Sequence, residues 1–264
     1  MAKERLDKLI FERGLAESRA RAQAMIIAGQ VLVREQRVDK PGHRVDTGAE
    51  IRIKGETLRY VGRGGLKLEA ALREFNVNPE GMACIDVGAS TGGFTDCLLQ
   101  HGAAAVWAVD VGHNQLAWRI RQDPRVKSLE GVNARALDPQ QFQTRFDLAT
   151  IDVSFISLTK ILPALGDCLK DGADIIALIK PQFEVGKGEV GRGGIVTDPL
   201  KHRLVLVEIA SAATALGLRP VAIIESPILG AEGNREFLIH LNKAAGVSAD
   251  ITALDERIRE LTPA

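Results

Sequence analysis

The chain has 264 residues, with 34 basic and 34 acidic side chains and a formal net charge of zero at pH 7. Hydrophobic residues make up 45% and charged residues 26% of the chain, which is ordinary for a globular protein with a core of its own. The opening stretch, MAKERLDKLIFERG, is charged throughout, and no apolar run reaches the roughly 18 residues of a membrane span. These features argue against a secreted or membrane-spanning protein, and we expect a cytoplasmic one.

Charge is distributed unevenly along the chain. Residues 1–60 contain 4 Lys and 9 Arg against 9 Asp and Glu, a net charge of +4, which leaves −4 for the rest. An Arg-rich first segment is a mild indication of nucleic-acid binding. The cysteines at 84, 97 and 168 are far apart and have no histidine at ligand spacing, so we expect buried thiols in a reducing compartment and no metal site.

The first 60 residues predict a small α+β domain. Apolar periodicity predicts one helix over 5–14 and a second over 18–29, with Ser18 as the N-cap of the second. Short strands are expected over 30–38 and 50–56, joined by turn-forming residues. Basic side chains in this domain belong either to a solvated face or to a surface that contacts RNA phosphates. The predicted RNA contacts among them are Arg5, Arg19, Arg21 and Arg34.

From residue 61 the pattern changes to alternating strands and helices. A helix is expected over 66–77, and later helices over 159–169, 199–217 and 252–261. Alternation of this kind predicts an α/β fold with a mostly parallel sheet and helices on both faces. The domain boundary is therefore placed between 1–60 and 61–264. Seven strands are predicted, over 83–88, 105–111, 126–131, 148–153, 174–180, 219–226 and 235–242.

A long Gly-rich stretch, residues 182–199, interrupts this alternation. Loops of more than about 12 residues inside compact domains are usually functional or disordered. Its glycines can act as hinges, and it carries Lys187 and Arg192. We expect the stretch to close over RNA with these two residues as contacts, and the alternative is a disordered loop.

The turn after the first strand of the sheet, DVGASTGGF, indicates a ligand crevice, because its glycines let the backbone approach a ligand closely. Its G-x-x-x-G-G spacing does not match the dinucleotide pattern, and no Lys-Ser/Thr pair of a phosphate loop follows. An acid after the second strand can accept hydrogen bonds from ribose hydroxyls, and an asparagine after the third can bind an adenine edge. Together they favour S-adenosylmethionine over a nicotinamide cofactor. The predicted cofactor-binding residues are Asp86, Gly88, Ser90, Gly92, Gly93, Phe94, Asp110, Val111, Asn133 and Asp152.

Four charged residues carry the candidate chemistry. Asp152 ends the fourth apolar strand and Lys180 the fifth, so both are expected at the carboxyl edge of the sheet, beside the crevice. Glu236 begins a late strand, and Lys67 lies on the helix before the first strand. The alternative for each of them, above all for Lys67, is a solvated surface charge.

The ordered set Lys67, Asp152, Lys180 and Glu236 resembles the Lys-Asp-Lys-Glu tetrad of the FtsJ-like RNA ribose 2′-O-methyltransferases. The segment RLDKLIFERGLAESRARAQAMIIAGQVLV resembles the RNA-binding domain of small-subunit ribosomal protein S4. The combination is similar to the TlyA/hemolysin-A family, and GRGGLKLEAAL, DVSFISL, LIKPQFE and EGNREFL extend the similarity along the chain. A local departure is Thr91, where the wider FtsJ-like group often has proline.

The resemblance implies a Rossmann-like class I methyltransferase domain behind an S4-type RNA-binding domain. It implies S-adenosylmethionine as the cofactor and methylation of cytidine 2′-hydroxyls in ribosomal RNA. The implied partners are ribosomal RNA or ribosomal subunits, with no membrane and no metal, and we expect a monomer or weak dimer.

A ribose hydroxyl must lose its proton as it attacks a methyl group, so a general base is needed. A free lysine has a pKa of about 10.4 and is protonated at neutral pH. Burial and a second ammonium group lower the pKa of a lysine, whereas a carboxylate raises it. The hypothesis makes Lys180 the base, assisted and oriented by Asp152, with Lys67 beside it in a closed crevice as the second ammonium group. Lys67 and Glu236 position the ribose and tune the Lys180–Asp152 pair.

Two hypotheses from other classes remain open at the level of sequence. One is a non-catalytic RNA-binding or ribosome-assembly factor with a vestigial methyltransferase fold, against which the intact tetrad argues. The other is a hemolysin-like, membrane-active protein, but the sequence contains no apolar span and no strongly amphipathic basic helix. A base methyltransferase usually carries an Asn/Asp-Pro-Pro-Tyr motif or a catalytic cysteine, and DVSF at 152–155 offers neither.

Overall fold

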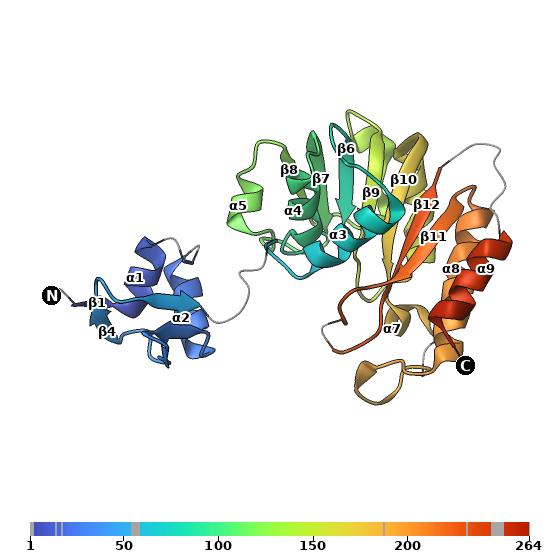
Figure 1. Ribbon diagram of the computed structural model, residues 1–264. Helices are drawn as coiled ribbons and strands as arrows, with labels where there is room; N and C mark the ends of the chain where they lie inside the picture. The colour runs from blue at the N-terminus through green and yellow to red at the C-terminus, as the bar shows by residue number, and fades with distance from the viewer. Residues whose placement is uncertain are drawn as a thin grey trace. The chain divides into compact units, whose positions relative to one another are not determined.

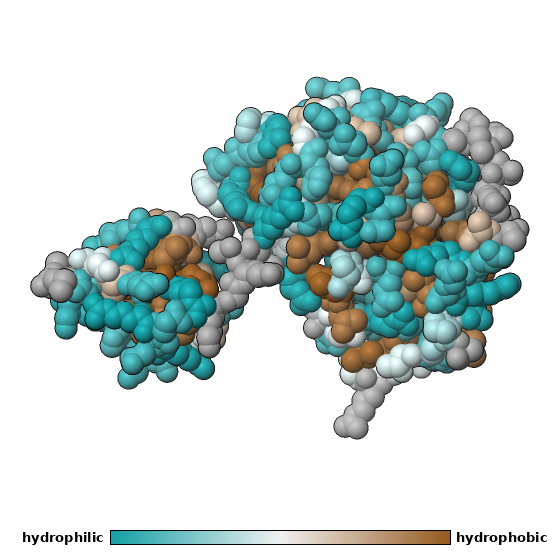
Figure 2. All heavy atoms as spheres, in the orientation of Figure 1, coloured by the Kyte–Doolittle hydropathy of each residue, from teal (hydrophilic) through white to brown (hydrophobic). Residues whose placement is uncertain are grey.

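The computed structural model describes residues 3–13, 15–16, 18–53, 59–186, 188–230, 232–243 and 251–263. The chain divides into two compact units, Met1–Arg59 and Tyr60–Ala264 (Figure 1). Figure 2 shows hydrophilic side chains over most of the visible surface of each unit. We call Met1–Arg59 the N-terminal unit and Tyr60–Ala264 the C-terminal unit, and describe each by itself.

The N-terminal unit is an α+β fold, as predicted. Its two helices bury Leu6 and Ile10 from the first and Ile26 from the second, together with Val31 and Val45 from the strands. The Ser18 hydroxyl accepts a hydrogen bond from the Arg21 amide at 3.1 Å, which caps the second helix. The elements are β1 (Lys3–Arg5), α1 (Leu6–Glu12), α2 (Arg19–Ile27), β2 (Val31–Val33), β3 (Gln36–Arg37), β4 (Arg44–Asp46) and β5 (Ile51–Ile53); β1 pairs with β4, and β2 lies between β3 and β5.

A buried carboxylate joins the two helices of this unit. Asp7, which has no exposed surface, accepts hydrogen bonds from Arg5 Nε and Nη2 at 3.0 and 2.9 Å, from Gln23 Nε2 at 2.7 Å and from Arg19 Nε at 3.1 Å. The Arg5 guanidinium contributes most to holding the pKa of Asp7 far below its usual range, although burial opposes it. Arg19 and Gln23 therefore tie α2 to α1 through Asp7, and Arg5 holds the same carboxylate from the N-cap of α1.

The C-terminal unit is built on a seven-stranded sheet in the order β11-β12-β10-β9-β6-β7-β8. The pairs β10–β9, β9–β6, β6–β7 and β7–β8 are parallel, whereas β12 is antiparallel to both of its neighbours. The predicted seven-stranded, mostly parallel sheet is confirmed. The strands are β6 (Ala83–Val87), β7 (Ala105–Asp110), β8 (Val126–Glu130), β9 (Phe146–Ile151), β10 (Leu169–Ile179), β11 (Arg219–Glu225) and β12 (Phe237–Asn242).

One strand begins earlier than predicted. The sequence pattern places it at 174, but β10 begins at Leu169, which pairs with Phe146 before a register shift that ends at Asp174. The preceding helix is correspondingly short, Leu162–Asp167, after a 3₁₀ turn over Leu158–Lys160. The irregular pairing explains the difference, because an interrupted ladder does not show a continuous two-residue alternation.

Helices cover both faces of the sheet, as predicted (Figure 1). Alternate residues of β10 face opposite sides. Ile175 and Ile179 belong to a core with α6, α8 and α9, whereas Ile176 and Leu178 belong to a core with α3, α4 and α5. The helices are α3 (Gly64–Phe75), α4 (Gly93–Gln100), α5 (Trp118–Arg121), α6 (Leu162–Asp167), α7 (Pro181–Glu184), α8 (Pro199–Ala215) and α9 (Ile251–Leu261).

Asp86 on β6 is buried in the centre of this unit. Its carboxylate accepts hydrogen bonds from Thr95 Oγ1 on α4 at 2.6 Å and from Thr150 Oγ1 on β9 at 2.9 Å. Burial raises its pKa from 3.8 to about 6, although the two threonine hydroxyls oppose the shift. The folded state therefore binds this proton more tightly than the unfolded state. Its contribution to stability is complete below about pH 4 and is lost as the pH rises through about 6.

We expect Asp86→Asn to abolish this pH dependence. Relative to the variant, the wild type should lose on the order of 2–3 kcal/mol of stability between about pH 4 and 6, because two pKa units correspond to that free energy. Urea unfolding at a series of pH values measures the difference. Tryptophan fluorescence reports on the C-terminal unit alone, because both tryptophans, Trp107 and Trp118, lie in it. Parallel stability curves for the two proteins over this range would contradict the prediction.

Candidate active site

Asp152 and Lys180 lie side by side at the carboxyl edge of the sheet. Asp152 directly follows β9 and Lys180 directly follows β10, and these neighbouring strands are parallel. Lys180 Nζ is 2.6 Å from Asp152 Oδ1 and donates a hydrogen bond to Ser154 Oγ at 3.1 Å. The side chains are 13% and 22% exposed, so the pair is shielded from bulk water but still reachable.

A second ion pair lies at the same edge. Glu236 directly precedes β12, whose first residue, Phe237, pairs with Ile179 at the end of β10. Lys67 reaches it from α3, with Nζ 2.5 Å from Glu236 Oε2 and exposures of 10% and 3%. The sequence-based hypothesis placed Lys67 next to Lys180. In the structure each of the two lysines contacts a carboxylate of its own.

The turn before β12 fits closely around Glu236. A Cβ atom on Gly230 would lie 2.5 Å from Glu236 Oε1 and 3.0 Å from its Cδ. The Glu236 carbonyl also accepts a hydrogen bond from the Ser226 amide at 2.9 Å. Glycine at position 230 thus leaves room for the carboxylate that holds Lys67.

A pocket opens beside the Asp152–Lys180 pair. The Gly-rich turn forms one wall, and there Gly88 has a φ of 84° and a Cβ on it would lie 2.4 Å from the Asp152 carbonyl oxygen. Only glycine fits this approach of the turn to the strand end. The lining residues are Gly62, Arg63, Gly64, Gly88, Ala89, Ser90, Thr91, Gly93, Phe94, Asp152, Ser154 and Lys180.

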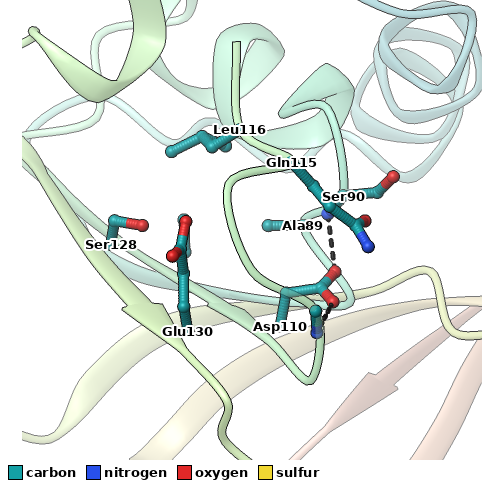
Figure 3. Close-up of a pocket in the computed structure, with 9 residues that line it drawn as sticks. Ala89, Ser90, Asp110, Gln115, Leu116, Ser128 and Glu130 are labelled. Atoms are coloured by element: carbon teal, nitrogen blue, oxygen red, sulfur yellow. Dashed lines mark hydrogen bonds between the residues drawn. The ribbon is translucent and has the colours of Figure 1, made fainter. Parts of the chain in front are cut away.

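A second, smaller pocket lies on the other side of the same turn (Figure 3). Asp110 at the end of β7 accepts hydrogen bonds from the Ser90 amide at 2.8 Å and the Gly112 amide at 2.7 Å. Figure 3 shows the Glu130 carboxylate pointing into the space beneath Leu116. The lining residues are Ala89, Ser90, Ala108, Asp110, Gly112, Gln115, Leu116, Ser128 and Glu130.

Carboxylates at two neighbouring strand ends suit an adenosyl ligand, because each can accept hydrogen bonds from ribose hydroxyls while Leu116 offers an apolar surface for a base. Ala89 and Ser90 line both pockets. A ligand that crosses the turn would therefore extend from the Glu130 end toward Lys180. The two carboxylates and the apolar surface of Leu116 therefore fit the adenosyl group of S-adenosylmethionine in their chemistry.

The structure distributes the predicted cofactor residues over three places. Gly88, Ser90, Gly93, Phe94, Asp110 and Asp152 line the two pockets, and a Cβ on Gly92 would lie 2.8 Å from Leu116 Cδ1. Asp86 lies behind the turn, bonded to its two threonines. Val111 is 72% exposed, and the exposed Asn133 accepts a hydrogen bond from the Arg135 amide at 3.1 Å. Asp86, Val111 and Asn133 are not among the lining residues of these two pockets.

Sequence reasoning missed several pocket residues. Glu130 ends the third strand of this sheet in the same way that Asp110 ends the second, so the rule that found Asp110 would also have found Glu130. No local signal marks Ser128, Gln115 or Arg63. They reach the pockets because their strand, loop and helix pack there.

The predicted RNA contacts have different surroundings. Arg21 is exposed, while Arg5 and Arg19 are held by Asp7. Arg34 is 68% exposed, and its Nη2 lies 3.9 Å from Asp46 Oδ2. Lys187 and the side chain of Arg192 lie outside the described residues. A groove of the N-terminal unit gathers further basic side chains around Arg34, namely Lys3, Arg37, Lys40, His43 and Arg44.

Neither a metal-binding cluster nor a membrane-spanning helix is present among the described residues. In the part of the chain that the structure describes, no three His, Cys, Asp or Glu side chains gather in a way that could hold a metal ion. Within the same part, no helix combines the length and the apolar character that crossing a membrane requires.

Comparison with known proteins agrees with this geometry. Residues 60–243 match the FtsJ-like methyltransferase family, and residues 4–51 match the S4 domain. The chain is 44% identical over 255 residues to the 16S/23S rRNA (cytidine-2'-O)-methyltransferase TlyA of Mycobacterium tuberculosis, which is 96% of this chain and 95% of that protein. The solved structure of a candidate hemolysin from Streptococcus thermophilus has a TM-score of 0.76 at 48% identity, covering 98% of this chain and 96% of that one.

A more distant structure shares only the fold. The S-adenosylmethionine-dependent methyltransferase of Mesorhizobium loti has a TM-score of 0.51 at 15% identity, covering 69% of this chain and 100% of that chain. The expected methyltransferase fold of the C-terminal unit is thereby confirmed. The resemblance predicted from the sequence motifs is confirmed as well: the chain belongs to the FtsJ-like methyltransferase family, with TlyA and a candidate hemolysin among its relatives and an S4 domain over residues 4–51.

Proposed function

We propose that the protein transfers a methyl group from S-adenosylmethionine to a ribose 2′-hydroxyl of ribosomal RNA, at cytidine. The observation that carries the proposal is the Lys180–Asp152 pair at the sheet edge, open to the pocket on the Gly-rich turn. The support for cytidine is the activity named for the TlyA relatives of Mycobacterium tuberculosis and Campylobacter jejuni. A ribosomal RNA substrate implies action in the cytoplasm.

The residues that would hold the cofactor lie on both sides of the Gly-rich turn. Asp110 and Glu130 would accept hydrogen bonds from the ribose hydroxyls, and Leu116 would pack against the adenine. The backbone of Gly88 and Ser90 leaves room for the rest of the molecule. S-adenosylmethionine supplies an already activated methyl group when bound, so the protein's main task is alignment.

Lys180 would accept the proton of the attacking hydroxyl. In the structure, Lys180 forms an ion pair with Asp152 at 2.6 Å, and a charged ammonium group cannot accept a proton. The base role therefore requires that Lys180 releases a proton to water when RNA binds. RNA that covers the pocket removes water from Lys180, and loss of water disfavours an ammonium group. Asp152 and Ser154 then keep Nζ aimed at the hydroxyl. Lys67 donates one of its three ammonium N–H groups to Glu236, and the other two would bind the ribose.

The N-terminal unit would hold RNA by its phosphates. Its groove gathers five cationic or ionisable side chains around Arg34, with Asp39 and Asp46 as the carboxylates among the lining residues. Contacts of this kind give affinity without base specificity and weaken steeply as salt rises. Selection of one nucleotide would then fall to the C-terminal unit.

Phe155 is a strong candidate for contact with the target base. It has a φ of 64° and is 89% exposed, and its ring is tilted against Phe183 at 4.7 Å. A bulky side chain at positive φ is a costly arrangement that occurs mainly at functional sites. Ser154, which precedes it, lines the pocket of Lys180. An aromatic ring at this place can stack on a nucleotide extruded from a helix.

We expect Phe155→Ala to lower kcat/KM for ribosomal RNA by about 10–100-fold, because base stacking on an aromatic side chain contributes roughly 1–3 kcal/mol. Methylation kinetics over a range of RNA concentrations measure the effect. Phe155→Trp serves as the control, since it keeps a stacking face and should retain most of the activity. Unchanged kinetics for the alanine variant would contradict the stacking role.

The function is tested by mapping 2′-O-methyl groups on ribosomal RNA and subunits after incubation with the purified protein and labelled S-adenosylmethionine. The expected product is methylated cytidine, and the RNA from reactions without protein is the control. Cofactor binding without any product would favour the non-catalytic assembly factor. Leakage of liposomes without RNA methylation would favour the hemolysin-like alternative.

A further inference from the structure

The segment 188–198, between α7 and α8, is held near its C-terminal end by two buried polar side chains. Val196 donates its amide proton to Asn234 Oδ1 at 2.9 Å, and its carbonyl accepts a hydrogen bond from His202 Nε2 at 2.9 Å. Asn234 Nδ2 also donates to the Gly194 carbonyl at 2.9 Å. Asn234 is 1% and His202 0% exposed. We call Val196, Asn234 and His202 the clamp.

The clamp connects this segment to the turn that carries Glu236. Asn234 stands two residues before Glu236, and its carbonyl accepts a hydrogen bond from the Gly230 amide at 2.9 Å. Gly230 in turn packs against the Glu236 carboxylate, where a Cβ would lie only 2.5 Å from Oε1. One compact turn therefore fits around Glu236 and binds the neighbouring segment with the side chain of Asn234.

The chemistry of both side chains suits this task. An amide offers an acceptor and a donor together, which Asn234 uses on Val196 and Gly194. Burial lowers the pKa of His202, so a neutral ring donates through Nε2 to the Val196 carbonyl. Buried hydrogen bonds are costly to break, because the groups left behind are cut off from water. The clamp is therefore a firm attachment.

The rest of the segment is attached more weakly. Lys201 Nζ reaches the Glu189 carbonyl at 2.9 Å and its carboxylate at 2.6 Å, but the two side chains are 33% and 57% exposed. Surface ion pairs of this kind contribute little. Gly188 and Gly193 have φ values of 91° and 73° with open space around them. The clamp thus holds the segment, which lies between α7 and α8 in Figure 1, against the turn that precedes β12.

We infer that Asn234 and His202 are positioning residues for the RNA substrate. They clamp the segment 188–198 to the turn that carries Glu236, so that RNA meets the segment and the Lys67–Glu236 pair in one fixed arrangement. This inference rests on the proposed function, since it assigns the segment to RNA. Neither side chain touches the reacting atoms, so the effect of their loss should fall on RNA binding.

Two substitutions and a matched control test the inference in the full-length protein. Asn234→Ala removes both hydrogen bonds, whereas His202→Gln is a conservative change whose amide can still donate to Val196. The control is His240→Ala. His240 is another largely buried histidine on β12, 7% exposed, with Nε2 2.8 Å from Asp174 at the opposite edge of the sheet. It reports the effect of losing a buried, hydrogen-bonding side chain away from the site.

Hydrogen–deuterium exchange measures how firmly the clamp holds the segment, independently of enzymatic activity. We expect amides of the segment 188–198 to exchange at least about tenfold faster in Asn234→Ala, because their local protection is lost, and to be unchanged in His240→Ala. Unchanged exchange in Asn234→Ala, or equal acceleration in the control, would overturn the clamp.

Steady-state kinetics of ribosomal RNA methylation test whether the clamp positions the RNA substrate. For Asn234→Ala we expect KM for RNA to rise about five- to twentyfold while kcat stays within about twofold, the pattern of lost substrate binding. Kd for S-adenosylmethionine should not change, and His202→Gln should stay close to the wild type. A fall in kcat at unchanged KM would show that Asn234 acts on Glu236 alone and would overturn the inference. A wild type that methylates no RNA refutes the proposed function and with it the RNA role, while the exchange result still decides the clamp.

Discussion

Lys180→Ala should lower the rate of ribose methylation at least about 100-fold, because a positioned general base contributes roughly 10²–10⁴ in rate. Lys180→Arg is the more informative change. Arginine keeps a positive charge beside Asp152 but cannot be deprotonated in a protein, so it cannot act as a base. We expect the arginine variant to be as inactive as the alanine variant. Single-turnover methylation of ribosomal RNA at saturating cofactor measures both.

The affinity for S-adenosylmethionine provides the control for Lys180. The proposed cofactor contacts lie mainly on the Gly-rich turn and around Glu130, so the Kd of both Lys180 variants for S-adenosylmethionine, measured by calorimetry, should stay within about threefold of the wild type. If Lys180→Arg retained a tenth or more of the wild-type rate, the lysine would act as a positive charge. The base would then have to be another group.

Glu236→Gln is expected to destabilise the protein and to abolish turnover together. The change leaves the Lys67 ammonium, which is only 10% exposed, without its carboxylate partner at 2.5 Å. Breaking a buried ion pair by removing one partner costs about 3–5 kcal/mol. Urea unfolding of the C-terminal unit and methylation kinetics measure the two losses.

The double variant Lys67→Met with Glu236→Leu separates these losses. Replacing both members of a buried pair with apolar side chains is often neutral or stabilising, so stability should return to near the wild-type value. Methylation should not return, because the proposed ribose contacts are gone. A stable double variant with near wild-type turnover would show that the pair is structural only.

Much of the fold could be predicted because its signals are local. Apolar runs bounded by turn residues identified all seven strands, and their alternation with helices identified the parallel sheet. The exception within β10 follows from its irregular pairing with β9. The antiparallel insertion of β12 between β10 and β11 had no local signal, because the direction of a strand depends on the path of the chain between elements.

The candidate site was predictable in its members and less so in its contacts. The sequence placed Asp152 and Lys180 at successive strand ends, and parallel pairing of those strands brings them together. Lys67 and Glu236, by contrast, are 169 residues apart in sequence and meet only because β12 lies next to β10 and α3 covers that face. Asn234 lies in the EGNREFL stretch that carries the resemblance, but nothing in the sequence indicated its contacts, since its partners are at positions 194 and 196 of another segment.

The sequence by itself determined the strands, most of the helices and the Gly-rich turn, because periodic burial and glycine requirements act over a few neighbouring residues. The four charged residues were proposed as a set from the resemblance to the FtsJ-like tetrad. Only the tertiary structure decided that Lys67 pairs with Glu236 and that Arg5 and Arg19 are held by Asp7. Charged side chains pair with the opposite charge that lies nearest in space, and breaking such a pair costs more free energy when it is buried. Those distances exist only once the sheet, the helices and the turns have packed.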